Sequence, residues 1–148
     1  MFTREVLPQL VERYVDAGQL QIVWNDFAWY GEESRVAAQA ARCAAKEGLF
    51  WGYHDTLYAH QRGINQGQFS STNLKQWAAD LGLSPEPFNA CLDAGDDVPS
   101  IQEDLVNGRS KGVIATPVFD INGERLFGPQ GIEAFAGIID AKLAQASR

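Results

Sequence analysis

The segment Gly112–Gly123, GVIATPVFDING, constrains the fold of this chain more than any other stretch. It places Pro117 directly before a short apolar run, Val118 to Ile121, and ends that run at Asn122-Gly123. Because proline has no N–H for a strand ladder, Pro117 must stand at the first residue of a strand, at an edge or at a bulge. Asn-Gly favours a β-hairpin, since both central residues need positive φ. We therefore expect a hairpin whose second strand is Arg125–Phe127.

Length and composition limit the class of protein. At 148 residues the chain fits one domain, and its 45% hydrophobic content allows a sizeable core. A net charge of -7 opposes contact with nucleic acid or anionic lipid, so no nucleic-acid partner is expected. No apolar run is long enough for a membrane span, and the first residues show no signal peptide.

The hydrophobic pattern predicts α and β segments in a mixed order. Phe2 to Val15 has helical spacing, with a bend or restart at Pro8, and Leu20 to Trp24 reads as a strand buried on both faces. Helices are then predicted from about residue 34 to about residue 110, where Thr72 is expected to cap the third one. A final helix follows the hairpin. The order is that of an α/β fold with a small central sheet and an inserted helical block.

This order resembles the thioredoxin fold, and particular residues resemble the DsbA-like thiol:disulfide oxidoreductases. Besides GVIATPVFDING, the matching stretches are FTREVLPQL, QIVWNDF, AAQAARCAAKEGLFWGYHDTLYAHQ, LGLSPEPFNACLDAG and the final helix. The resemblance covers nearly the whole chain. It implies a single domain over residues 1–148, with a thioredoxin-like fold and a helical insertion at about 34–110.

The redox motif of that family, C-P-x-C, is absent from the sequence. In the family its second Cys precedes the phenylalanine matched by Phe2 by about three positions, and a strand precedes the motif. We therefore expect an N-terminal truncation that removes the first strand and the motif. The alternative is a natural relative without the dithiol. No catalytic residue is expected within the 148 residues.

Thr116 and Pro117 match the loop that faces the redox motif in the family. There the proline is cis, and the residue before it aligns the substrate. By base rates a cis bond is unusual, since about 5 to 6% of X-Pro bonds in folded proteins adopt it. The resemblance over the whole chain outweighs that rate and implies that Thr116 and Pro117 bind substrate.

The chain has two cysteines, Cys43 and Cys91, on the inward faces of different predicted helices. Some members of the family carry an additional disulfide between these helices, so the resemblance implies a structural disulfide. It would stabilise the fold by roughly 4 kcal/mol in the chain-entropy model. Two unpaired buried thiols are the first alternative, because cysteine is among the most buried residue types. A catalytic pair at this separation is the interpretation favoured least.

No metal site or cofactor is expected. His54 and His60 are six positions apart on one predicted helix, so they point to different sides, and His54 belongs to an apolar stripe. In the family electrons pass between cysteines, which requires no organic cofactor.

The resemblance implies a thiol:disulfide oxidoreductase that acts on cysteine-containing polypeptides and works with a redox partner protein. It also implies an extracytoplasmic location, in the periplasm or cell envelope. One alternative is a redox-inactive thioredoxin-fold module that binds peptides. A second is a relative similar to the glutathione-dependent isomerases, in which a residue at the start of the first helix acts together with bound glutathione. Thr3 is a poor candidate for that residue. Loss of the first strand would leave one edge of the sheet uncovered. An uncovered edge predicts a homodimer or poor solubility.

Overall fold

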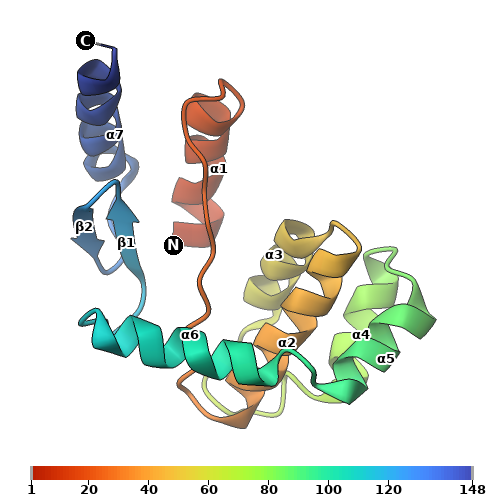
Figure 1. Cartoon of the computed structure of the whole chain (residues 1–148). Helices are drawn as coiled ribbons and strands as arrows, with labels where there is room; N and C mark the ends of the chain where they lie inside the picture. Colours follow the sequence, from red (N-terminus) through yellow and green to blue (C-terminus); the bar gives the residue numbers. More distant parts are fainter. Residues whose placement is uncertain (1, 148) are drawn as a thin grey trace. The chain divides into compact units, whose positions relative to one another are not determined.

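A computed structural model describes residues Phe2–Ser147 and divides the chain into two compact units (Figure 1). The discontinuous unit combines residues 1–24 with residues 112–148, and the inserted unit contains residues 25–111. The expected helical block at about 34–110 falls within the inserted unit. The expectation of a single domain over residues 1–148 stays a prediction.

The discontinuous unit begins with a helical segment that runs from Phe2 to Val15. It consists of wide π-type turns at Phe2–Val6 (η1) and Val11–Val15 (η2) on either side of an α-helical turn, Leu7–Leu10 (α1). Pro8 lies in the first turn of α1, where a missing N–H is tolerated, so it restarts the helix as expected.

The segment Leu20–Trp24 forms no strand, so that prediction was wrong. A strand needs a hydrogen-bonded neighbour, and the sheet formed by the described residues has two strands, both elsewhere in the chain. Burial on both faces was also wrong. Leu20 and Ile22 pack against the core of the unit, whereas Val23 is 67% exposed.

The hairpin follows the prediction, and the final helix packs near it. Val118–Ile121 (β1) pairs antiparallel with Glu124–Phe127 (β2), in a register that places Val118 opposite Phe127. Asn122 and Gly123 have φ of 48° and 88°, as the tight turn requires. The hairpin and the helix Ile132–Ala146 (α7) share one core with the first helical segment, formed by Val6, Leu10, Tyr14, Phe135, Ala136 and Ile139.

The inserted unit is entirely helical in its regular structure. Its helices are Glu32–Lys46 (α2), Phe50–His60 (α3), Ser71–Asp80 (α4), Pro85–Ala94 (α5) and Val98–Ser110 (α6). Ser70, and not Thr72, caps α4, because its hydroxyl accepts a hydrogen bond from the Asn73 amide at 3.3 Å. Serine at this position leaves Thr72 inside the first turn, where its side chain is no cap.

Two kinds of contact fix the helices of the inserted unit. Its apolar core joins α2 to α3, α4 and α5, with Ala40, Tyr53 and Phe88 fully or almost fully buried. At its edge the Arg42 guanidinium donates to Asp26 at 2.7 Å and to Asp104 at 2.6 Å, which ties α2 to α6 and to the preceding loop. No helix among residues 2–147 is long and apolar enough to span a bilayer.

Candidate functional site

The loop before β1 holds the predicted substrate-binding residues. The Thr116-Pro117 peptide bond is cis. The Pro117 carbonyl accepts a hydrogen bond from the Gly128 amide at 2.9 Å, which continues the hairpin by one step beyond Val118. Thr116 is exposed, and none of the described residues hydrogen-bonds to its backbone. Its N–H and C=O are therefore open to an external partner at the end of a strand.

The strand that follows this loop is firmly packed. The Phe119 ring lies 4.4 Å from the Phe2 ring and 4.8 Å from the Phe135 ring, measured between centroids. This cluster joins β1 to the first helical segment and to α7. The aromatic contacts stabilise the position of β1, which begins directly after this loop. By contrast Ile114, two residues before Thr116, is 85% exposed.

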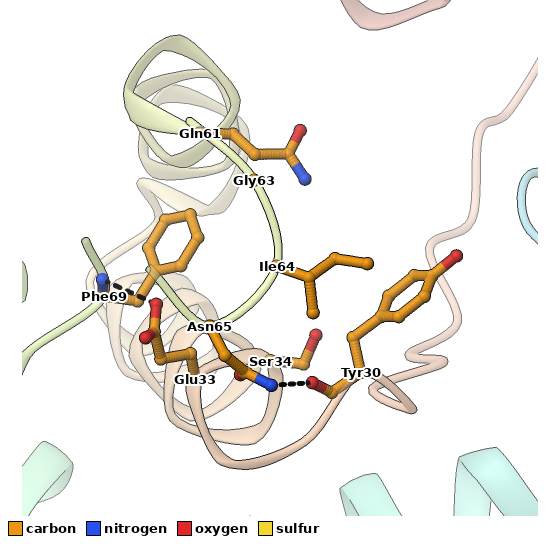
Figure 2. A pocket seen from close by; sticks show the side chains of 8 residues that line it. All are labelled: Tyr30, Glu33, Ser34, Gln61, Gly63, Ile64, Asn65 and Phe69. Carbon is orange, nitrogen blue, oxygen red and sulfur yellow. Dashed lines mark hydrogen bonds between the residues drawn. The ribbon is translucent and has the colours of Figure 1, made fainter. Parts of the chain in front are cut away.

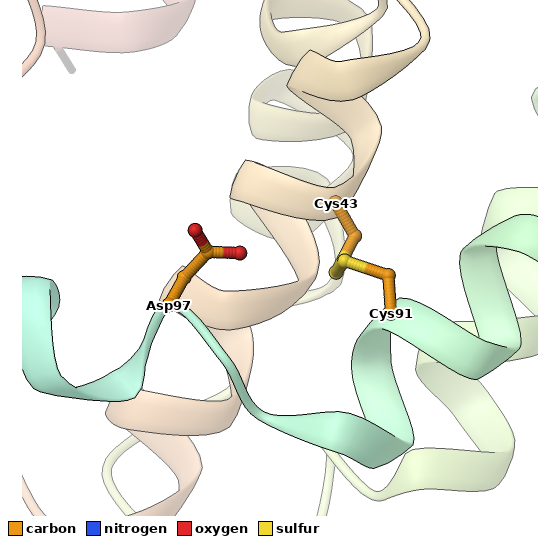
Figure 3. A group of neighbouring side chains, drawn as sticks. All are labelled: Cys43, Cys91 and Asp97. Atoms are coloured by element: carbon orange, nitrogen blue, oxygen red, sulfur yellow. A yellow bond between two sulfur atoms is a disulfide. The ribbon is translucent and has the colours of Figure 1, made fainter.

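A disulfide joins Cys43 of α2 to Cys91 of α5 (Figure 3). Cys43 is buried and Cys91 is half-buried. Both sulfurs receive the Gln39 side-chain amide, which lies 3.4 Å from the Cys43 Sγ and 3.9 Å from the Cys91 Sγ. That amide also donates to the Cys91 carbonyl at 3.0 Å. The buried Gln39 side chain thus contacts both sulfurs on the inner side of the bridge.

Two charged groups lie on the outer side of the disulfide. The Lys46 ammonium is 3.3 Å from the Cys91 Sγ and 2.8 Å from an Asp97 carboxylate oxygen. The Gln39 amide approaches the same oxygen at 3.4 Å, while the Gln39 side-chain oxygen accepts from the Asp97 amide at 3.1 Å. The half-buried sulfur therefore faces a cation whose charge is balanced by one carboxylate.

The same residues form the group that most resembles a metal site in the described part of the chain. The ligand atoms of Cys43, Cys91 and Asp97 lie within 4.8 Å of one another (Figure 3). The two sulfurs are bonded to each other, however, and thiolates are what a metal requires. The Lys46 ammonium on Asp97 also opposes a second cation there.

The structure gives the two histidines separate environments. His54 is 3% exposed, and its Nδ1 lies 2.9 Å from the Asp55 carboxylate. Burial lowers the pKa of His54, an effect that the adjacent Asp55 carboxylate opposes. His60 Nδ1 lies 2.8 Å from the Thr56 carbonyl, and the His60 ring stacks on Trp77 at 4.1 Å. His54 thus packs in the core, where the apolar stripe placed it.

The hollows that the described residues form include two on the inserted unit. One has a volume of about 40 Å³ between the start of α2 and the loop after α3, where Glu33 accepts from the Phe69 amide and Asn65 donates to the Tyr30 carbonyl (Figure 2). That volume admits a few waters and no drug-sized molecule. The other, about 230 Å³, is lined by Thr56, His60, Trp77, Asp80 and Leu81.

The comparisons with known proteins identify the family. A family model described as Thioredoxin matches residues 1–141, and the chain belongs to this thioredoxin family. Within it the fold is that of the DsbA-like proteins. An oxidised crystal structure of BdbD from Bacillus subtilis superposes with a TM-score of 0.87 at 21% identity, covering 97% of this chain and 79% of that one. For alpha-DsbA1 of Wolbachia pipientis the TM-score is 0.80 at 21% identity, with 98% and 79% covered.

Curated relatives share sequence over most of this chain. A Na(+)/H(+) antiporter NhaA of Herminiimonas arsenicoxydans is 31% identical over 132 residues, which cover 80% of this chain and 20% of the antiporter. A probable disulfide bond formation protein D of Bacillus cereus is 34% identical over 122 residues, which cover 80% of this chain and 56% of that protein. The chain therefore spans only part of the length of these relatives.

These findings confirm the resemblance and the thioredoxin-like fold class expected from the sequence. The side chains around the disulfide, in contrast, were not predicted from the sequence. Lys46 and Gln39 lie four positions or fewer from Cys43 on α2, so helical spacing places them on the same side as that cysteine. Asp97 carried no such signal, because only the turn between α5 and α6 brings it back to the sulfurs.

Proposed function

We propose that this chain is the substrate-binding part of a DsbA-like thiol:disulfide oxidoreductase that acts on cysteines in polypeptides. The observation that carries the proposal is that Thr116 is exposed, lies two residues before β1, and has no hydrogen-bond partner for its backbone among residues 2–147. Membership of the thioredoxin family supports the same reading. A relative named as a probable disulfide bond formation protein also supports it.

The proposed role of Thr116 is to pair with an extended segment of the substrate. Main-chain hydrogen bonds at an open strand end hold a polypeptide irrespective of its side chains, which suits an enzyme with many protein substrates. Pro117 contributes no donor, and its carbonyl is already bonded to Gly128, so it directs the substrate to Thr116. Exposed Ile114 extends the contact with an apolar side chain.

The proposed chemistry is exchange between a substrate dithiol and a C-P-x-C motif expected ahead of Phe2. Such exchange requires a thiolate, usually at a helix N-terminus, and a second cysteine close to it. In the described part of the chain both cysteines are bonded to each other, on different helices. The reaction needs no organic cofactor, because the electrons pass between cysteines of the substrate, of the motif and of a redox partner protein. Such proteins work in oxidising compartments, which agrees with an extracytoplasmic location.

Nuclear magnetic resonance can test the binding role of Thr116. A cysteine-containing, extended peptide with its thiols alkylated is titrated into the isotope-labelled chain. The Thr116 amide signal should shift on saturation, whereas the Gly123 amide, which donates to Asp120 at 2.8 Å, should not. Equal shifts at both amides, or none at Thr116, would contradict the proposed binding site.

The reading frame ahead of Met1 tests the redox part of the proposal. A C-P-x-C that ends about three residues before Phe2, without an intervening stop codon, supports an oxidoreductase. The protein translated from that frame should then oxidise a reduced model polypeptide. A frame without the motif would overturn the redox part. Peptide binding at Thr116 would then favour the second candidate, a redox-inactive peptide-binding module.

A further inference from the structure

We propose that the Cys43–Cys91 disulfide is a second thiol-disulfide exchange site, which a small dithiol reduces in the folded protein to a Cys43 thiol and a Cys91 thiolate held by Lys46. This site lies in the inserted unit and uses none of the residues assigned above to substrate binding. It does not depend on a C-P-x-C motif. A failure of the proposed function would therefore leave this proposal unaffected, and the reverse also holds.

Lys46 lies against one sulfur of the bridge. Its ammonium lies 3.3 Å from the Cys91 Sγ, on a side chain whose backbone is three residues beyond Cys43 on the same helix. A neutral disulfide gains little from a cation at that distance, whereas a thiolate gains a charge-assisted contact. The contact therefore favours the reduced state of the bridge over the oxidised state.

The two sulfurs differ in their access to a reagent. Cys43 is 2% exposed, whereas Cys91 is half-buried and faces the exposed Lys46 side chain. An incoming thiolate consequently reaches the Cys91 Sγ. The leaving sulfur is then that of Cys43, and the Gln39 amide at 3.4 Å is placed to donate to it as negative charge develops. Burial then favours protonation of Cys43 to the neutral thiol.

The exchange balances in two steps. In the first, one sulfur of the dithiol bonds to the Cys91 Sγ, the Sγ–Sγ bond breaks, and its electron pair goes to the Cys43 Sγ, which takes up a proton. In the second, the other sulfur of the dithiol attacks the first one and releases Cys91 as a thiolate beside Lys46. The dithiol becomes a cyclic disulfide and loses two electrons and two protons. One of these protons remains on Cys43, and the other goes to solvent.

Asp97 makes the proposal testable by the sign of an effect. Its carboxylate shares the Lys46 ammonium at 2.8 Å and lies close enough to repel a thiolate on Cys91. Without Lys46, the thiolate would face that carboxylate alone, so reduction would become harder. Without the Asp97 charge, the ammonium would act on the thiolate unopposed, so reduction would become easier. A structural disulfide that is reduced only when the chain unfolds, where these contacts are lost, predicts no such opposition between the two variants.

The experiment measures the equilibrium between the folded full chain and mixtures of reduced and oxidised dithiothreitol. Samples are quenched with acid and their free thiols are alkylated. Mass spectrometry then gives the fraction of the chain in which the bridge is reduced. Lys46→Met should lower the equilibrium constant for reduction about fivefold, and Asp97→Asn should raise it about fivefold, for charges near a protein surface. Circular dichroism under the same conditions checks that the chain stays folded when the bridge is reduced.

The matched controls are Lys75→Met and Asp93→Asn. Lys75 and Asp93 form an ion pair of 2.7 Å in the same unit, and among the described residues neither side chain is hydrogen-bonded to a sulfur. Both controls should leave the equilibrium constant unchanged. Three outcomes would overturn the proposal: reduction only where the chain unfolds, shifts of the same sign for Lys46→Met and Asp97→Asn, or shifts no larger than those of the controls.

A monothiol tests the direction of attack. The folded chain is incubated with glutathione, trapped by acid, and its mixed disulfide is located by peptide mapping. The adduct is expected on Cys91, the half-buried sulfur. An adduct found on Cys43 would contradict the assignment of the two sulfurs.

Discussion

His54 shows how one buried side chain can make the stability of the inserted unit depend on pH. Its ring is 3% exposed and packs against Trp51 and Tyr58, at centroid distances of 5.3 and 4.8 Å. Burial disfavours the imidazolium and lowers the pKa of His54 in the folded state below the ordinary 6.5, although the Asp55 carboxylate opposes the shift. The unfolded chain has no such penalty.

We therefore expect the free energy of unfolding to fall as the pH falls below 6.5. In that range the unfolded state binds a proton that the folded state does not, so acid favours unfolding until the lowered pKa is reached. One proton contributes a slope of at most about 1.4 kcal/mol per pH unit. Urea unfolding between pH 5 and pH 8, about the range where histidine titrates, measures this slope.

Two variants separate His54 from other titrating groups. His54→Phe should remove its part of the slope, because phenylalanine fills a similar volume without a proton to bind. Asp55→Asn should extend the loss of stability to lower pH, since it removes the carboxylate that raises the pKa of His54. An unchanged slope in His54→Phe would show that other groups cause the pH dependence.

At the scale of single residues, apolar spacing predicted the burial of His54 well. The stripe through Tyr53, His54 and Leu57 was sufficient, because a helix converts spacing into a face. The neighbours of Cys91 were not predictable in the same way. Lys46 and Asp97 reach its sulfur from helix α2 and from the turn before α6, and such a meeting depends on how the helices pack.

Among the elements, the hairpin allows a prediction about backbone conformation alone. Gly123 has a φ of 88°, and a Cβ added there would meet no atom within 4 Å. Gly123→Ala should therefore destabilise the discontinuous unit by about 1 kcal/mol, which is the backbone cost of an L-residue with positive φ. Urea unfolding measures the difference.

Gly137 provides the matched control for that change. It lies within α7, has no positive φ, and a Cβ there would also meet no atom within 4 Å. Gly137→Ala should stabilise the unit by up to about 1 kcal/mol, since alanine favours the helix interior. If both variants shifted stability in the same direction, backbone conformation would not be the cause.

The helices and the hairpin were predictable because their backbone hydrogen bonds form within the element itself or with its nearest neighbour in sequence. The hairpin needed only the Asn122-Gly123 turn, and α5 is marked by Ser84-Pro85 at its start and Gly95 at its end. Leu20–Trp24 failed for the opposite reason. Its apolar residues give it strand propensity, yet a strand also requires a neighbour from elsewhere in the chain, and none of residues 2–147 supplies one.

At the scale of the whole molecule, the disulfide closes a long loop of the inserted unit. Its cysteines are 48 residues apart, for which the chain-entropy model gives about 4 kcal/mol of stabilisation. Replacing both residues, Cys43→Ala with Cys91→Ala, should lower the free energy of unfolding in urea by about that amount. Titration of the denatured, unreduced wild-type chain should find no free thiol as a check on the starting material. A loss below about 1 kcal/mol would contradict the expected contribution.

The open edges of the hairpin predict self-association. The sheet of the described residues has two strands, and Phe127 on β2 is 59% exposed. Unpaired edges with apolar side chains favour pairing with a second copy, so we expect a dimer or low solubility in sedimentation experiments. Phe127→Glu should weaken the association, whereas Val106→Glu, at a 54% exposed position of the inserted unit, should not. A monomer at high concentration would contradict the expectation.

The division into units also has a consequence for synthesis of the chain on the ribosome. The inserted unit is one continuous stretch, residues 25–111, so all of its core has been synthesised before the hairpin is made. The discontinuous unit needs α7 to cover Val6 and Leu10. Its first helical segment therefore lacks its packing partner until α7 has been translated. Translation proceeds at about 5–20 residues per second. During that interval a chaperone can reach the apolar face of this segment, while the inserted unit can already fold.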